Sequence, residues 1–183
     1  MTRALAGPAD VVTFWRTAGP EKWFAKDDAF DAEITRRFLA TYEAAVAGEL
    51  ASWEEAAEGA LALLITLDQL PRNMFRGSAR TFAADPLARA VANRAIARGF
   101  DESFAAADRQ FFYLPFEHSE AMEDQERAVA LFRAMGDAEA LKWAELHLDI
   151  IRRFGRFPHR NVALGRASTP EEVEFLAGGG FGG

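Results

Sequence analysis

Large apolar residues in this chain recur at the spacing of an α-helix. The clearest run lies between Asp27 and Leu50, where one follows every fourth position. Its members are Phe30, Ile34, Phe38, Tyr42, Val46 and Leu50. This spacing lines one face of a helix, whereas a half-buried strand alternates apolar and polar residues with a period of two. No segment sustains that alternation, so the chain is predicted to be all-α.

A second strong signal runs from Ala56 to Leu70, where most residues are apolar. Ser52 followed by Glu55 fits a capping box that would start this helix, and Pro71 is expected to end it. A helix that is apolar almost all round belongs in a core, so we expect it at the centre of the fold. With the shorter periodic stretches, the pattern predicts six to eight helices packed as antiparallel hairpins.

Length and composition favour one helical domain over residues 1–177. A chain of 183 residues can bury roughly 70% of the surface that its unfolded form exposes, and it has no cysteine for disulfides. Residues 178–183 read GGGFGG and are predicted to be a disordered tail. The chain shows no signal-peptide pattern, and no apolar run approaches the ~20 residues of a membrane span. We therefore expect a cytoplasmic protein without a membrane partner.

The net charge of −7 argues against a nucleic-acid partner, because phosphate binding needs a basic surface. Positive charge is nevertheless concentrated locally. No acidic residue lies between Asp149 and Glu171, and this stretch contains Arg152, Arg153, Arg156, Arg160 and Arg166. A second acid-free stretch, residues 69–84, contains Arg72, Arg76 and Arg80.

These arginines have two readings. Guanidinium groups bind carboxylates and phosphates in bidentate fashion, so the two stretches would form an anion site if they meet. Alternatively, the arginines pair with Glu117, Glu120 and Asp124 in a structural ion-pair network. The sequence leaves both readings open.

The three histidines all lie in the last 66 residues. His118 and His159 follow prolines in predicted loops, whereas His147 shares one helical face with Trp143 and Ile151 and should point inward. Imidazole and carboxylate groups could hold a metal, but the intervals between the histidines match no metal motif, and no metal site is predicted. The simpler reading of His147 is a core histidine bonded to a backbone or carboxylate group.

Varied polar groups among Leu, Phe and Pro at element ends point to a common cleft that binds a small anionic ligand. The candidate catalytic residues are Glu117, His118 and His159, with Glu117 or His118 as general base. The candidate ligand-binding residues are Asp68, Arg72, Asn73, His147, Arg156, Arg160 and Asn161. No nucleophile, P-loop or dinucleotide motif is present, so the sequence establishes no catalysis and identifies no cofactor.

Five sequence blocks stand out in order along the chain. They are Phe14-Trp15, Trp23-Phe24 before Phe30-Asp31, LDQLPRNMFRG at 67–77, FFYLPFEHSE at 111–120 and RFGRFPHRN at 153–161. In these blocks the chain resembles an uncharacterised bacterial family, domain-of-unknown-function family 924. The resemblance covers nearly the whole chain and implies an all-α fold with a tetratricopeptide-like arrangement of helical hairpins. It implies no established activity.

That implied arrangement suggests a second function, an interaction module that holds an extended peptide or its C-terminal carboxylate in a basic concave groove. The chain itself lacks the 34-residue repeat pattern of tetratricopeptide sequences. A third alternative is a helical domain without a ligand that associates weakly with itself. A monomer or weak homodimer is therefore expected.

Overall fold

The computed structural model describes residues 5–182, and every regular element within them is helical. The all-α prediction is confirmed for these residues. The first four residues of the predicted domain and the last residue of the predicted tail lie outside the described residues. Among residues 5–182, no helix combines the length and apolar character needed to cross a membrane.

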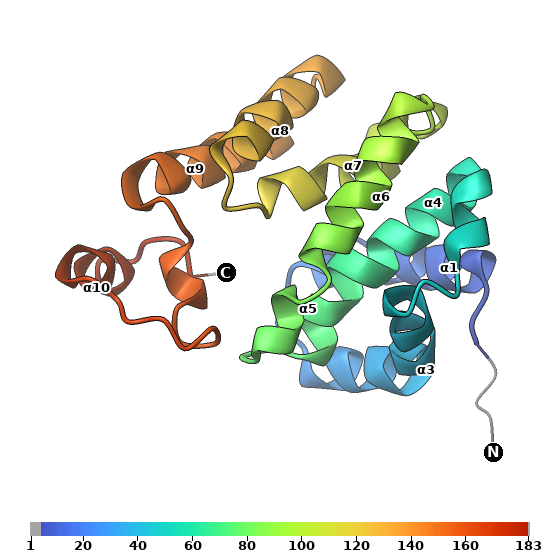
Figure 1. The fold of residues 1–183 in the computed structure, drawn as a ribbon, viewed down its shortest axis with the longest axis horizontal. Helices are drawn as coiled ribbons and strands as arrows, with labels where there is room; N and C mark the ends of the chain where they lie inside the picture. The colour runs from blue at the N-terminus through green and yellow to red at the C-terminus, as the bar shows by residue number, and fades with distance from the viewer. Residues whose placement is uncertain (1–4, 183) are drawn as a thin grey trace. The chain divides into compact units, whose positions relative to one another are not determined.

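Eight of the α-helices in residues 5–182 span eight residues or more, which agrees with the six to eight predicted (Figure 1). They are α1 (Pro8–Ala18), α3 (Asp28–Val46), α4 (Ala57–Leu64), α6 (Asp85–Ala97), α7 (Ala106–Glu117), α8 (Met122–Met135), α9 (Ala138–Phe154) and α10 (Pro170–Ala177). Two shorter ones, α2 (Pro20–Trp23) and α5 (Leu70–Met74), and several 3-10 turns lie between them.

The described chain divides into two compact units. Unit 1 contains the described residues up to Arg76 together with Arg80–Pro115, and unit 2 contains Gly77–Ala79 and the described residues from Phe116 onward. The single domain over residues 1–177 stays a prediction, because two compact units can still unfold as one.

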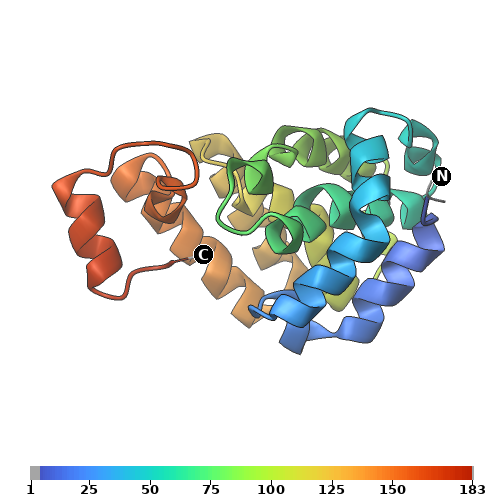
Figure 2. The same ribbon diagram turned by 90° about the horizontal axis from the view of Figure 1, so that it is seen from below.

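The centre of unit 1 is the helical run formed by α4, a π-helical turn at Ile65–Gln69 and α5. Every residue from Gly59 to Pro71 is buried. Helices α1, α3 and α6 pack against this run, and Figures 1 and 2 show α4 beside α6 and α3 beside α5. This agrees with the central helix expected from the sequence.

The start of this run differs from the prediction. Ala51–Glu55 forms a separate 3-10 turn, η1, and α4 begins at Ala57 without a side-chain cap, so the capping box predicted at Ser52 is wrong. The contact at Gly59 explains why η1 is separate from α4. A Cβ atom at this position would lie 2.1 Å from the carbonyl oxygen of Trp53, so η1 packs directly against the backbone of α4 instead of extending it.

The end of the run also differs, because Pro71 does not stop it. The amide of Leu70 donates to the carbonyl oxygen of Ile65, five residues back, which is the hydrogen bond of a π-helix. Pro71 then lies in the first turn of α5, where its missing N–H is tolerated. The π-helical turn carries Asp68 and Gln69 into the buried part of unit 1.

Aromatic side chains from the family-like blocks close the core of unit 1. The ring of Phe111 lies edge-on to Trp15 and Trp23, with centroids 6.1 and 5.0 Å away. The indole N–H of Trp23 donates to the carbonyl oxygen of Trp15 at 2.7 Å. These contacts tie α1 and α2 to α7.

Unit 2 is built on the antiparallel hairpin of α8 and α9, which lie side by side in Figure 1. Gly136, with a φ of 80°, ends α8, and the carboxylate of Asp137 caps α9 by accepting from two backbone amides. The unit's core contains Ile150, Ile151 and Phe157, with Phe154, Phe175 and Phe181 packed against it.

Candidate functional site

The residues predicted to share one cleft are divided between the two units. Unit 1 contains Asp68, Arg72 and Asn73. Unit 2 contains Glu117, His118, His147, Arg156, His159, Arg160 and Asn161. The single cleft predicted to hold all of them stays a prediction.

In unit 1, Arg72 joins two buried carboxylates. Its guanidinium donates to both oxygens of Asp85, at 3.1 and 3.2 Å, and lies 3.3 Å from an oxygen of Asp68. It also donates to the backbone carbonyl of Asp68 in the π-helical turn. Burial lowers the pKa of Arg72, but the two carboxylates outweigh burial and the pKa is raised. Arg72 is therefore a charged link between α5 and α6.

Asn73 and Arg76 turn toward α3 instead. The side-chain amide of Asn73 donates to Asp31 at 2.8 Å, and Arg76 donates to the other oxygen of the same carboxylate at 2.5 Å. In unit 1 the contacts of Arg72, Asn73 and Arg76 therefore favour the ion-pair reading. The acidic partners are Asp31, Asp68 and Asp85. They differ from those suggested by the sequence, which were all sought after residue 116.

In unit 2, Glu172 is the hub of a second network. It is 1% exposed and accepts from Arg156 at 2.6 and 2.8 Å, from the side chain of Asn161 at 3.1 Å and from the backbone of Thr169 at 2.7 Å. Arg156 and Asn161, both predicted ligand-binding residues, thus hold the start of α10. The spacing of Thr169 and Glu172 is that of a capping box, which marks a helix start but does not identify the arginine partner.

Arg166 extends this network to the loop before α8. Its guanidinium forms a bidentate pair with Glu120 at 2.7 and 2.9 Å and also donates to the side-chain oxygen of Asn161 at 2.9 Å. Glu120 also accepts from the backbone amide of Phe157 at 2.8 Å. Burial raises the pKa of Glu120, but Arg166 and the Phe157 amide outweigh burial and lower it. Glu120 is an acidic partner that the sequence suggested correctly for this network.

His147 lies in the core of unit 2, as its place on the apolar face of α9 predicts. It is 6% exposed, and its Nδ1 lies 2.8 Å from the carbonyl oxygen of Trp143 and 3.2 Å from a carboxylate oxygen of Glu117. Both neighbours are acceptors, so Nδ1 carries the hydrogen. The histidine thus has both of the partners that the simpler reading proposed, a backbone group and a carboxylate.

The position of Trp143 differs from the prediction for this helical face. It was expected to point inward with His147, but it is 44% exposed and its indole N–H donates to Glu139 at 3.1 Å. A large indole needs a partner for its N–H, and the exposed first turn of α9 supplies one.

Gln125 of α8 fixes the end of α7 and was not predicted from the sequence. Its buried side-chain amide donates to the carbonyl oxygens of Glu117 and Ser119, both at 2.6 Å. These bonds hold the backbone that carries Glu117. His118, in the turn directly after α7, is half-buried, and its catalytic role stays a prediction.

Three side chains that can carry positive charge converge on the buried ring of Phe157. The rings of His147 and His159 lie 5.4 and 5.6 Å from it, centroid to centroid, and the guanidinium carbon of Arg160 lies 4.5 Å from its centroid. The chain is turned for this by Gly155, whose φ of 67° ends α9. Of the predicted ligand-binding residues, His147 and Arg160 therefore lie together with the candidate catalytic residue His159.

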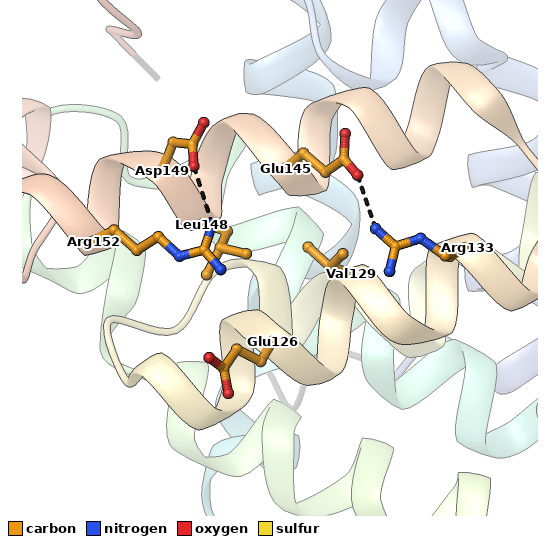
Figure 3. A pocket seen from close by; sticks show the side chains of 7 residues that line it. All are labelled: Glu126, Val129, Arg133, Glu145, Leu148, Asp149 and Arg152. Carbon is orange, nitrogen blue, oxygen red and sulfur yellow. Dashed lines mark hydrogen bonds and ion pairs between the residues drawn. The ribbon is translucent and has the colours of Figure 1, made fainter.

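A separate groove of about 370 Å³ runs along the α8–α9 hairpin (Figure 3). Four of its charged groups form two ion pairs, Arg133 with Glu145 at 3.0 Å and Arg152 with Asp149 at 3.4 Å. None of the predicted site residues lines it. Within residues 5–182, no three His, Asp or Glu side chains gather in a way that could hold a metal ion.

The fold and these contacts define an all-α protein whose buried polar residues form arginine–carboxylate networks and a histidine cluster beside one of them. Over residues 11–180 the chain matches the family described as bacterial protein of unknown function (DUF924), and it belongs to that family. The resemblance noted in the sequence is thereby confirmed.

One solved structure gives a close comparison. It is a protein of unknown function from Agrobacterium tumefaciens that is 51% identical in sequence, and the match covers 92% of this chain and 96% of that one with a TM-score of 0.90. No protein of curated function matches this chain. The comparisons therefore establish the family and support the fold, and they assign no activity.

Proposed function

We propose that the protein binds a small anionic ligand in unit 2, beside His147, His159 and Arg160. The observation that carries this proposal is the convergence of these three side chains on Phe157. The ring of Phe157 is fully buried, so the three side chains that contact it each face an apolar group on that side. An anion gains more from positive groups in such poorly hydrated surroundings than it would at an open surface.

The arginine–carboxylate network supports the proposal by holding this place rigid. Hydrogen bonds among Arg156, Asn161 and Glu172, and between Arg166 and Glu120, hold the loop that carries His159. A site whose groups are already held in position loses less entropy when its ligand binds. We therefore assign Arg156 and Asn161 to support of the site, and His147, His159 and Arg160 to contact with the ligand.

Glu117 extends the proposal toward proton transfer. Its carboxylate contacts Nδ1 of His147, which is the arrangement that orients an imidazole for acid–base work. The candidate catalytic residues remain Glu117, His118 and His159. The proposal itself concerns binding, and it requires no reaction.

Titration calorimetry at low salt with inorganic phosphate and with acetate tests the proposal. We expect saturable binding to the unaltered chain and affinity at least about 10-fold weaker in His159→Ala and Arg160→Met, because each loses a charge-assisted hydrogen bond. Arg153→Ala is the matched control, since this exposed arginine of the same stretch pairs with Glu171.

The proposal fails if the unaltered chain binds neither anion, or if Arg153→Ala weakens binding as much as the other two variants. Unfolding by urea, measured on each variant, separates loss of the site from loss of the fold. Unchanged stability with weakened binding is the expected result for His159→Ala.

The second proposed function is that of an interaction module that binds a peptide. Tetratricopeptide-like arrays are built from helical hairpins. The α8–α9 pair is a helical hairpin, and the exposed Trp143 and Leu146 lie on its second helix. If the ligand is the C-terminal carboxylate of a peptide, a short peptide with a free carboxylate should bind and its amidated form should not. Equal binding of both forms would exclude recognition of the carboxylate, and binding of neither form would count against the interaction module.

A further inference from the structure

The glycine-rich segment after α10 has a defined conformation, although its composition predicts disorder. The amide of Gly180 donates to the carbonyl oxygen of Phe175 at 2.9 Å, and the amide of Gly179 donates to that of Leu176 at 3.3 Å. Gly179 has a φ of 81°. These are the two hydrogen bonds and the left-handed residue of a Schellman motif, which ends a helix and reverses the chain.

Gly180 must be glycine for this turn to form. A Cβ atom built on it would lie 2.6 Å from the ring of Phe175 and 2.6 Å from its carbonyl oxygen. The backbone of Gly180 therefore packs flat against Phe175, and the chain then runs back toward α9, as Figure 2 shows.

The turn places Phe181, the one large side chain of the segment, beside the proposed ligand site. Its ring lies 4.6 Å from the ring of His147 and 5.2 Å from that of His159, edge-on in both cases, and 6.4 Å from the ring of Trp143. The two histidines that contact Phe157 thus also contact Phe181. The ring of Phe181 thus contacts the rings of Trp143 and His147 on α9 and of His159 after it, and we call the place that it takes among them the slot.

We infer that Phe181 is an intramolecular occupant of the ligand site, and that the ligand is an anion carrying a flat apolar group that takes the place of the Phe181 ring. This inference rests on the proposed function. His147, His159 and Arg160 supply the polar groups for the carboxylate, and the slot supplies the aromatic neighbours that the ring of an arylcarboxylate would meet. The segment 179–182 acts as a strap that such a ligand displaces.

The ligand binds only those molecules in which Phe181 has left the slot. Its apparent affinity is therefore the affinity for the open form multiplied by the fraction of molecules that are open. Its ring contacts hold most molecules closed, and we expect release of the strap to strengthen binding roughly 10-fold. An anion too small to need the slot should be affected much less.

Benzoate and acetate are the probes, because both present a carboxylate and only benzoate carries a ring. Each is titrated calorimetrically into the unaltered chain, Phe181→Gly and Gly180→Ala. Phe181→Gly removes the occupant, whereas Gly180→Ala keeps Phe181 but breaks the turn that delivers it. Both variants should bind benzoate about 10-fold more tightly, with little change for acetate. Gly182→Ala, whose Cβ would meet nothing within 4 Å, should behave like the unaltered chain.

If acetate binds the unaltered chain but neither variant gains affinity for benzoate, the strap is wrong and the proposed anion site stands. If Phe181→Gly lowers stability without changing benzoate affinity, Phe181 is only a packing residue. If no variant binds either probe, the proposed function and the strap both fail.

Discussion

Among single residues, Glu172 does most to fix the arginine-rich loop of unit 2. The hydrogen bonds from Arg156 lower the pKa of this carboxyl group from its usual 4.5 to about 2, although burial acts in the opposite direction. Thr169 and Asn161 add hydrogen bonds that also lower it. The Glu172 carboxylate therefore keeps its negative charge in this buried position because of these hydrogen bonds.

This shift predicts how stability depends on pH. Because the folded-state pKa of Glu172 lies below its unfolded value, its contribution to stability is complete above about pH 5 and is lost as the pH falls toward 2. Glu172→Gln should lower the melting temperature at pH 7 and weaken the dependence of melting temperature on pH within that window. Glu171→Gln, at an exposed neighbouring position, should do neither. The same acid dependence in the unaltered chain and in Glu172→Gln would contradict this role.

The sequence predicted the partners of individual residues only in part. His147 was expected to point inward toward a backbone or carboxylate acceptor, because helical periodicity fixes which face a side chain occupies. The partners of Arg72 and Arg156 were not predicted, since Asp85 and Glu172 reach them through tertiary packing. Glu172 carried a capping signal, but a capping signal describes only its own helix.

At the scale of elements, the contact between η1 and α4 depends on one glycine. Gly59→Ala would place a Cβ atom 2.1 Å from the carbonyl oxygen of Trp53, so one of the two backbones must shift. We expect the free energy of unfolding in urea to fall by roughly 1–3 kcal/mol, although alanine favours a helix over glycine by about 1 kcal/mol. Glu58→Ala, at the exposed neighbouring position, should be nearly neutral. An unchanged or higher stability of Gly59→Ala would refute this packing.

Errors in predicting elements came from signals with more than one structural meaning. Ser52 and Glu55 match a capping box, yet they lie in a separate turn that packs on the helix. Pro71 commonly ends a helix, but here the π-helical turn accommodates it. The glycines at 178–180 suggest a flexible tail by composition, and glycine is also the residue that a Schellman turn requires. Local sequence fits more than one structure at these positions, and tertiary packing determines which structure forms.

For the molecule as a whole, periodicity was sufficient to predict the all-α class, since the spacing of apolar residues reports directly on the secondary structure that can bury them. The division into two units was not predicted. It falls at Pro115 and Phe116, inside α7, where no linker composition marks it. The tetratricopeptide-like arrangement remains a proposal, because a single α8–α9 hairpin does not make a repeat.

The central claim is that a small anion binds beside His147, His159 and Arg160. The most direct test follows the imidazole signals of the histidines by nuclear magnetic resonance during titration with inorganic phosphate. We predict that the signals of His147 and His159 shift together along one saturating curve, and that Arg160→Met abolishes both shifts. Signals that do not move, or that shift equally in Arg160→Met, would contradict the account.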